Sequence, residues 1–113
     1  GEENIFLFGF SQGACLAFDY ACRHAVKYAG VMVLSGGLIG PHIKENNYSG
    51  DFDGTEIFIG CSDSDSHIPL QRLDDSAVLA TAMGAKVDKR IYPGMGHTIN
   101  EDELQKVKRM VQT

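Results

Sequence analysis

The sequence predicts an α/β fold with a mostly parallel sheet and helices on both faces. Short apolar segments alternate with segments whose apolar residues recur at helical spacing, in the order strand, helix, strand, strand, helix, strand, helix. Apolar strands separated by helices are typical of parallel strands joined by right-handed crossovers. With 113 residues, of which 43% are hydrophobic and 22% charged, the chain has the composition of one globular domain.

The first half of the chain contains two predicted strands and one predicted helix. Residues 4–9 are apolar and rich in aromatic side chains, as expected of a strand covered on both faces. A buried helix is predicted over residues 12–24, and a second strand over residues 31–34. The apolar positions of the helix are Ala14, Cys15, Phe18, Ala21, Cys22 and Ala25. Glycine, asparagine and aspartate dominate residues 40–54, which predicts a loop.

The second half begins with a predicted strand over residues 56–60. A helix is predicted over residues 69–83, because Pro69 suits a first helical turn and Gly84 a C-terminal cap. Its shared apolar face is Leu73, Ala77 and Ala80. Residues 86–92 predict the last strand, and its lysine and arginine side chains are those expected at the edge of a sheet.

A final helix is predicted from its capping signal. Either Thr98 with Glu101 or Asn100 with Glu103 forms a capping box, and basic residues near the end suit the helix dipole. The buried face is expected to consist of Leu104, Val107 and Val111.

Composition and charge argue against several classes of function. A formal charge of -5 and a pI near 5.2, with scattered lysine and arginine, argue against nucleic acid as a partner. No apolar run is long enough to span a membrane. Three cysteines, an odd number, favour free thiols and a cytoplasmic location. Gly1 stands where an initiator methionine would, so we interpret the chain as a fragment or a trimmed chain; the sequence leaves a homodimer open.

The segment Gly9-Phe10-Ser11-Gln12-Gly13 is a G-x-S-x-G motif between a predicted strand and a predicted helix. In this setting a tight turn presents the serine at the carboxyl edge of the sheet, and glycines avoid clashes around the turn. The helix directs its N–H groups and positive dipole end at the reaction centre, so the N–H of Gln12 is a candidate oxyanion donor. We therefore predict that Ser11 is a nucleophile.

A serine hydroxyl needs a base to accept its proton, and His97 is the best candidate. His97 lies in a glycine-containing loop that leaves the last strand at the same edge as Ser11. His24 ends the first helix, His42 lies in the polar loop, and His67 is expected to pack near Pro69. These three histidines are weaker candidates for the base.

The acid that orients His97 should follow the strand over residues 56–60, where Asp63 and Asp65 are available. We favour Asp65. Asp63, Asp65 and His67 could instead suggest a metal site, but their loop lacks the further ligands that a closed site needs, so no metal is predicted.

Four segments together resemble the phospholipase/carboxylesterase group of α/β-hydrolases, which includes acyl-protein thioesterases. They are Gly9-Phe10-Ser11-Gln12-Gly13-Ala14, Leu34-Ser35-Gly36-Gly37, Asp65-Ser66-His67-Ile68-Pro69 and Tyr92-Pro93-Gly94-Met95-Gly96-His97. In that family the acid stands three residues before a Val/Ile-Pro pair, which selects Asp65 over Asp63. The resemblance implies that residues 1–113 are the C-terminal part of an α/β-hydrolase domain. The family's earlier strands, and its second oxyanion donor, would precede Gly1.

The resemblance implies hydrolysis of a small carboxylic ester or thioester without a cofactor, through attack by Ser11 and an acyl-enzyme intermediate. Residues that could border the acyl group follow the second strand or precede His97: Gly36, Gly37, Leu38, Ile39 and Met95. The alternative hypothesis is a non-catalytic α/β module that binds a ligand or partner at the carboxyl ends of its strands. Neither a dinucleotide fingerprint nor a P-loop lysine is present to support a nucleotide ligand.

Overall fold

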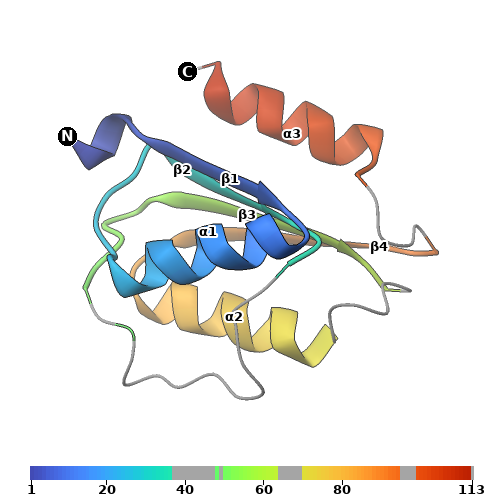
Figure 1. Cartoon of the computed structure of the whole chain (residues 1–113), viewed down its shortest axis with the longest axis horizontal. Helices are drawn as coiled ribbons and strands as arrows, with labels where there is room; N and C mark the ends of the chain where they lie inside the picture. The colour runs from blue at the N-terminus through green and yellow to red at the C-terminus, as the bar shows by residue number, and fades with distance from the viewer. Residues whose placement is uncertain (37–47, 49, 64–69, 95–98, 113) are drawn as a thin grey trace.

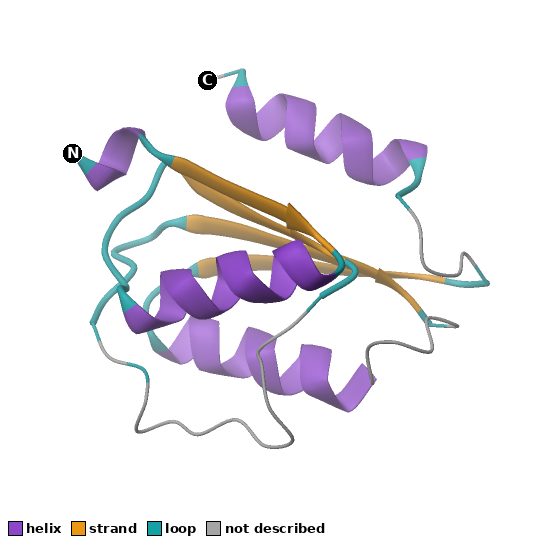
Figure 2. Cartoon of the chain, viewed as in Figure 1, coloured by secondary structure: helices purple, strands orange, loops and turns teal. Residues whose placement is uncertain are grey.

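Four parallel strands form one sheet in the computed structural model of the chain, which describes residues 1–36, 48, 50–63, 70–94 and 99–112 (Figures 1 and 2). In chain order the elements are a 3-10 turn η1 (Glu2–Asn4), β1 (Phe6–Phe10), α1 (Gln12–Arg23), β2 (Gly30–Leu34), β3 (Glu56–Ser62), α2 (Leu70–Ala82), β4 (Lys86–Tyr92) and α3 (Glu101–Val111). The predicted order and the parallel sheet are confirmed, and the predicted helix and strand boundaries are correct to within about two residues.

The strands are ordered β1-β2-β3-β4, so strands that are consecutive in the chain are also neighbours in the sheet. The register pairs Phe10 with Leu34, Leu34 with Gly60, and Ser62 with Tyr92. The carboxyl ends of all four strands therefore lie at one edge of the sheet.

Helices α1 and α2 cover one face of the sheet and α3 covers the other, as Figure 1 shows. The alternation of side chains along β2 divides the core accordingly. Val31 and Val33 belong to the cluster that contains Phe18 of α1 and Leu73 of α2. Met32 and Leu34 belong instead to a smaller cluster with Phe58 and Met110 on the α3 side. All five residues of β2 are buried, which explains the continuous apolar run.

β1 departs from the prediction that both of its faces are covered. It lies at one edge of the four described strands, and the side chain of Phe8 is 52% exposed. Helix α3 contacts β2 on this face. Phe6 and Phe10 pack against the cluster beside α3, whereas Phe8 is not among its residues. The apolar sequence thus predicted the strand correctly but overstated its burial.

The N-terminus of α3 confirms one of the two predicted capping boxes. The side chain of Asn100 accepts a hydrogen bond from the Glu103 N–H (2.8 Å), and the Glu103 carboxylate accepts one from the Asn100 N–H (3.1 Å). The predicted buried face was partly wrong: Leu104 is 42% and Val111 46% exposed, whereas Glu103 and Met110 are buried. Glu103 and Met110 therefore belong to the buried face of α3.

Gly60 of β3 leaves the space that the Glu103 side chain occupies. A Cβ atom at Gly60 would lie 2.2 Å from Glu103 Oε2. This oxygen is buried and has no hydrogen-bond partner among the residues described. Burial raises the pKa of Glu103 above its ordinary value, the hydrogen bond from Asn100 opposes the rise, and the negative charge of Asp102 adds to it.

Replacing Glu103 with glutamine should remove a pH-dependent loss of stability. The raised pKa means that the Glu103 carboxyl binds its proton more tightly in the folded state than in the unfolded state. Its contribution to the free energy of unfolding therefore falls as the pH rises from the ordinary pKa of 4.5 through the pKa of the folded state. Glu103→Gln keeps an acceptor for the Asn100 N–H but cannot ionise. Urea unfolding between about pH 4 and pH 8 should therefore show the variant gaining stability relative to the wild type as pH rises. A constant difference across that range would contradict the prediction.

Candidate active site

The carboxyl edge of the sheet carries a row of polar residues and glycines. Ser11 follows β1, Ser35 follows β2, Asp63 follows β3 and Gly94 lies two residues beyond β4. Backbone hydrogen bonds continue the pairing of the strands into this row: Ser11 N–H to Leu34 O (2.9 Å), Ser35 N–H to Gly60 O (2.7 Å) and Asp63 N–H to Tyr92 O (3.1 Å). The edge at which the sequence predicted the site is thus a connected row of turns.

Ser11 occupies the tight turn between β1 and α1. Its backbone, at φ 59° and ψ -122°, lies outside the regions that serine ordinarily adopts. It stands at the N-cap of α1, where serine usually accepts a hydrogen bond through its hydroxyl, but its side chain makes no such capping bond. Its carbonyl accepts hydrogen bonds from Ala14 N–H (3.1 Å) and Cys15 N–H (3.2 Å). The Ser11 carbonyl thus bonds to the first turn of the helix.

Two glycines let other backbones approach this turn. A Cβ atom at Gly9 would lie 2.3 Å from the carbonyl oxygen of Gly13 and 2.5 Å from the Ala14 nitrogen. A Cβ atom at Gly36 would lie 2.5 Å from the Cβ of Ala14 and 3.0 Å from the Ser11 carbonyl oxygen. By contrast, a Cβ at Gly13 would meet nothing within 4 Å. Gly9 and Gly36 are therefore required by packing, and Gly13 is not.

Gln12 is the first residue of α1 and is exposed. The first N–H groups of a helix have no acceptor within the helix, and the positive end of the helix dipole is concentrated there. A negative charge that develops beside Ser11 would meet both features. The Gln12 N–H as oxyanion donor stays a prediction.

Of the four histidines, the structure describes His24 alone. His24 stands at the C-cap of α1, with its ring 4.7 Å from that of Tyr20. Ser11 stands at the other end of this 12-residue helix, roughly 18 Å away. His24 therefore cannot accept the proton of Ser11. His97, His42 and His67 lie outside the described residues, so the choice of His97 stays a prediction.

Asp63 holds the chain that leaves β4. Its carboxylate accepts a hydrogen bond from the Gly94 N–H (2.9 Å), in addition to the backbone bond to Tyr92 O. The sequence had presented Asp63 as the less favoured acid and as one member of a metal site that was judged incomplete. An aspartate directly after one strand and a glycine after the next was the available signal for this role. Asp65 lies outside the described residues and stays a prediction.

Among the residues predicted to border the acyl group, Gly36 is described. Gly36 is buried against the turn at Ser11, and the structure shows it packing closely there. The others, Gly37, Leu38, Ile39 and Met95, lie outside the described residues.

All three cysteines lie within the described residues, and none of them is in a disulfide. Cys22 and Cys61 are buried, and burial raises the pKa of Cys22 to about 12, so that thiol stays protonated near neutral pH. Within the described ranges no three histidine, cysteine or acidic side chains are grouped to hold a metal ion. The same residues contain no helix that is both long and apolar enough to cross a membrane.

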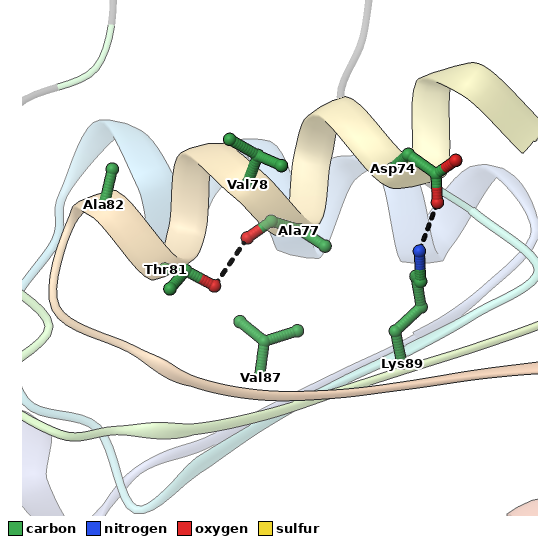
Figure 3. A pocket seen from close by; sticks show the side chains of 7 residues that line it. All are labelled: Asp74, Ala77, Val78, Thr81, Ala82, Val87 and Lys89. Atoms are coloured by element: carbon green, nitrogen blue, oxygen red, sulfur yellow. Dashed lines mark hydrogen bonds and ion pairs between the residues drawn. The ribbon is translucent and has the colours of Figure 1, made fainter.

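A groove of about 690 Å³ lies between α2 and β4, at the edge of the sheet opposite β1 (Figure 3). It is largely apolar, and an ion pair between Asp74 and Lys89 crosses it. The remaining lining residues are Ala77, Val78, Thr81, Ala82 and Val87. None of them belongs to the row at the carboxyl ends of the strands, so this groove is separate from the candidate active site.

Comparison with known proteins matches all of residues 1–113 to the phospholipase/carboxylesterase family. The chain belongs to this family. A crystal structure of a phospholipase/carboxylesterase from Dyadobacter fermentans superposes with a TM-score of 0.96 at 42% identity, over 99% of this chain and 54% of that one. The α/β-hydrolase fold predicted from the sequence is thereby confirmed.

Two curated relatives carry names that indicate related activities. Acyl-protein thioesterase 1 of Saccharomyces cerevisiae is 32% identical over 110 residues, covering 91% of this chain and 46% of that protein. A probable carboxylesterase SOBER1-like of Arabidopsis thaliana is 26% identical over 103 residues, covering 91% of this chain and 39% of that protein. The chain thus spans about half the length of the relatives it matches, or less.

The glycine contacts predict opposite effects of alanine at two positions of the motif. Gly9→Ala should destabilise the fold by about 3 kcal/mol, because its Cβ would overlap backbone atoms of α1 that cannot move independently. Gly13→Ala is the matched control; it adds a methyl group in open space and should stabilise α1 by about 0.5–1 kcal/mol. Urea unfolding measures both, and equal stabilities for the two variants would refute this account of the turn.

Proposed function

We propose that the chain carries the catalytic residues of a serine hydrolase that cleaves carboxylic esters or thioesters. Ser11 is the nucleophile, His97 the general base and Asp65 the acid that orients the histidine. The N–H of Gln12 stabilises the oxyanion. The acyl group is transferred to Ser11 and then to water.

The observation that carries the proposal is the backbone of Ser11. A strained serine between a strand and a helix, at the carboxyl edge of a parallel sheet, is the arrangement that exposes a nucleophile in α/β-hydrolases. Strain that persists at such a position is typical of functional sites.

The relatives support the reaction class. They are named as an acyl-protein thioesterase and a probable carboxylesterase, and the Dyadobacter structure as a phospholipase/carboxylesterase. All of these names refer to hydrolysis of an ester or thioester bond. A carbonyl carbon is therefore the proposed point of attack.

The proposed reaction proceeds in two steps. His97 takes the hydroxyl proton as Ser11 forms a bond to the carbonyl carbon, and the proton then passes to the departing alcohol or thiol. A water molecule repeats the sequence on the acyl-enzyme, giving the carboxylic acid and restoring the serine. Asp65 holds the imidazole in the tautomer that both steps need.

A fluorophosphonate probe distinguishes this proposal from the alternative of a non-catalytic binding module. The probe reacts with activated serines, so labelling of the complete protein that is lost in Ser11→Ala supports a hydrolase. The absence of labelling of a folded, complete protein would support the binding module.

Substitutions of the proposed residues should lower turnover in a graded way. On a short p-nitrophenyl ester, Ser11→Ala or His97→Ala should reduce kcat by roughly four to six orders of magnitude, and Asp65→Asn by about four. Asp63→Asn should do far less. If Asp63→Asn were the more damaging of the two aspartate changes, the assignment of the acid would be wrong.

The pH dependence should report a neutral histidine base. Protonated His97 cannot accept the serine proton, so kcat/KM should be low in acid. It should rise with pH through one apparent pKa of about 6.5. Addition of EDTA should leave the rate unchanged. Activity that EDTA abolishes and a divalent metal restores would overturn this mechanism.

A further inference from the structure

The segment that joins β4 to α3 is held at both ends by carboxylates. At its start, Asp63 Oδ1 accepts a hydrogen bond from the Gly94 N–H at 2.9 Å. At its end, Glu103 Oε1 accepts one from the Asn100 N–H at 3.1 Å. The sequence between these two anchors contains His97, the proposed general base.

Asp63 is itself fixed to the sheet. It follows Ser62, which is in register with Tyr92 at the last described pair of β3 and β4, and its own N–H donates to the Tyr92 carbonyl at 3.1 Å. The side chain then accepts a hydrogen bond from the Gly94 N–H, two residues beyond the end of β4. Gly94 has a φ of 64°, so the chain turns here. The carboxylate of Asp63 therefore continues the pairing of β3 and β4 into this turn.

We infer that Asp63 is a positioning residue of the active site, which fixes the point from which the chain departs toward His97. This inference rests on the proposed function. Only two residues separate Gly94 from His97 in the sequence, so His97 must lie within about 10 Å of the point that Asp63 fixes. Catalytic groups tolerate little displacement, since an error of about 1 Å can cost roughly 100-fold in rate.

Glu103 provides the second anchor. Its side chain is fully buried against Gly60 of β3, and it holds Asn100 through the capping box. Both anchors thus connect to β3, the strand that precedes Asp65 in the sequence. β3 therefore contacts both anchors of the segment that contains the proposed base, and the proposed acid follows β3 in the sequence.

A positioning role differs from an acid role in its chemical requirement. Holding the Gly94 N–H needs only an acceptor oxygen, which asparagine also has, whereas orienting and stabilising an imidazolium needs the negative charge. Asp63→Asn should therefore keep kcat within about threefold of the wild type, while Asp63→Ala should lower kcat by about 10- to 100-fold with little change in KM.

The variants are compared in the complete protein, by steady-state hydrolysis of a p-nitrophenyl ester. Asp74→Ala is the matched control, because it removes an exposed, ion-paired aspartate that contacts β4 away from the site and should leave kcat unchanged. NMR hydrogen exchange of the Gly94 amide is measured in the same proteins. Exchange should be about 10-fold faster in Asp63→Ala and unchanged in Asp63→Asn.

Two results would overturn the inference: an Asp63→Ala protein with wild-type turnover and exchange, or an Asp63→Asn protein as impaired as Asp63→Ala. Failure of the proposed function is a separate result, in which Ser11→Ala hydrolyses the ester as fast as the wild type. The exchange of the Gly94 amide does not depend on turnover, so it still decides whether Asp63 holds the segment.

Discussion

Close approach of backbones around Ser11 is the constraint on which the rest of this structure depends. Atoms of α1 lie so near Gly9, and those of Gly36 so near Ala14, that neither glycine has room for a Cβ. This spacing lets the helix start directly after the end of β1, and Ser11, in the turn between them, has a φ of 59°. Both the strained serine and the placement of helical N–H groups beside it follow from this contact.

The turns after successive strands are joined to the sheet by backbone hydrogen bonds. Ser11 bonds to the end of β2, Ser35 to the end of β3 and Asp63 to the end of β4, so each turn is located by the neighbouring strand. The side chain of Asp63 extends the series to Gly94. A site assembled from loops after different strands needs such connections, because its members are distant in sequence and each loop alone is free to move.

Local signals predicted the elements well, and burial less well. The G-x-S-x-G motif located the turn at Ser11, and the capping pair Asn100 and Glu103 located the start of α3. The exposure of Phe8 and the inward direction of Glu103 were missed. The exposure of Phe8 and the burial of Glu103 both depend on where α3 lies over the sheet. The spacing of apolar residues within one helix does not predict that position. For Glu103, the decisive feature is a gap on another strand, at Gly60.

The sequence by itself determined the order of strands and helices, the family, and the chemistry available to Ser11, because each is written in short-range spacing and residue type. Only the tertiary structure showed that the carboxylate of Asp63 accepts a hydrogen bond from the Gly94 N–H. Its hydrogen bond to Gly94 joins residues 31 positions apart, and such a contact exists only once β3 and β4 have paired in register. The separation of His24 from Ser11, by contrast, follows from the helix between them, which the sequence already predicted.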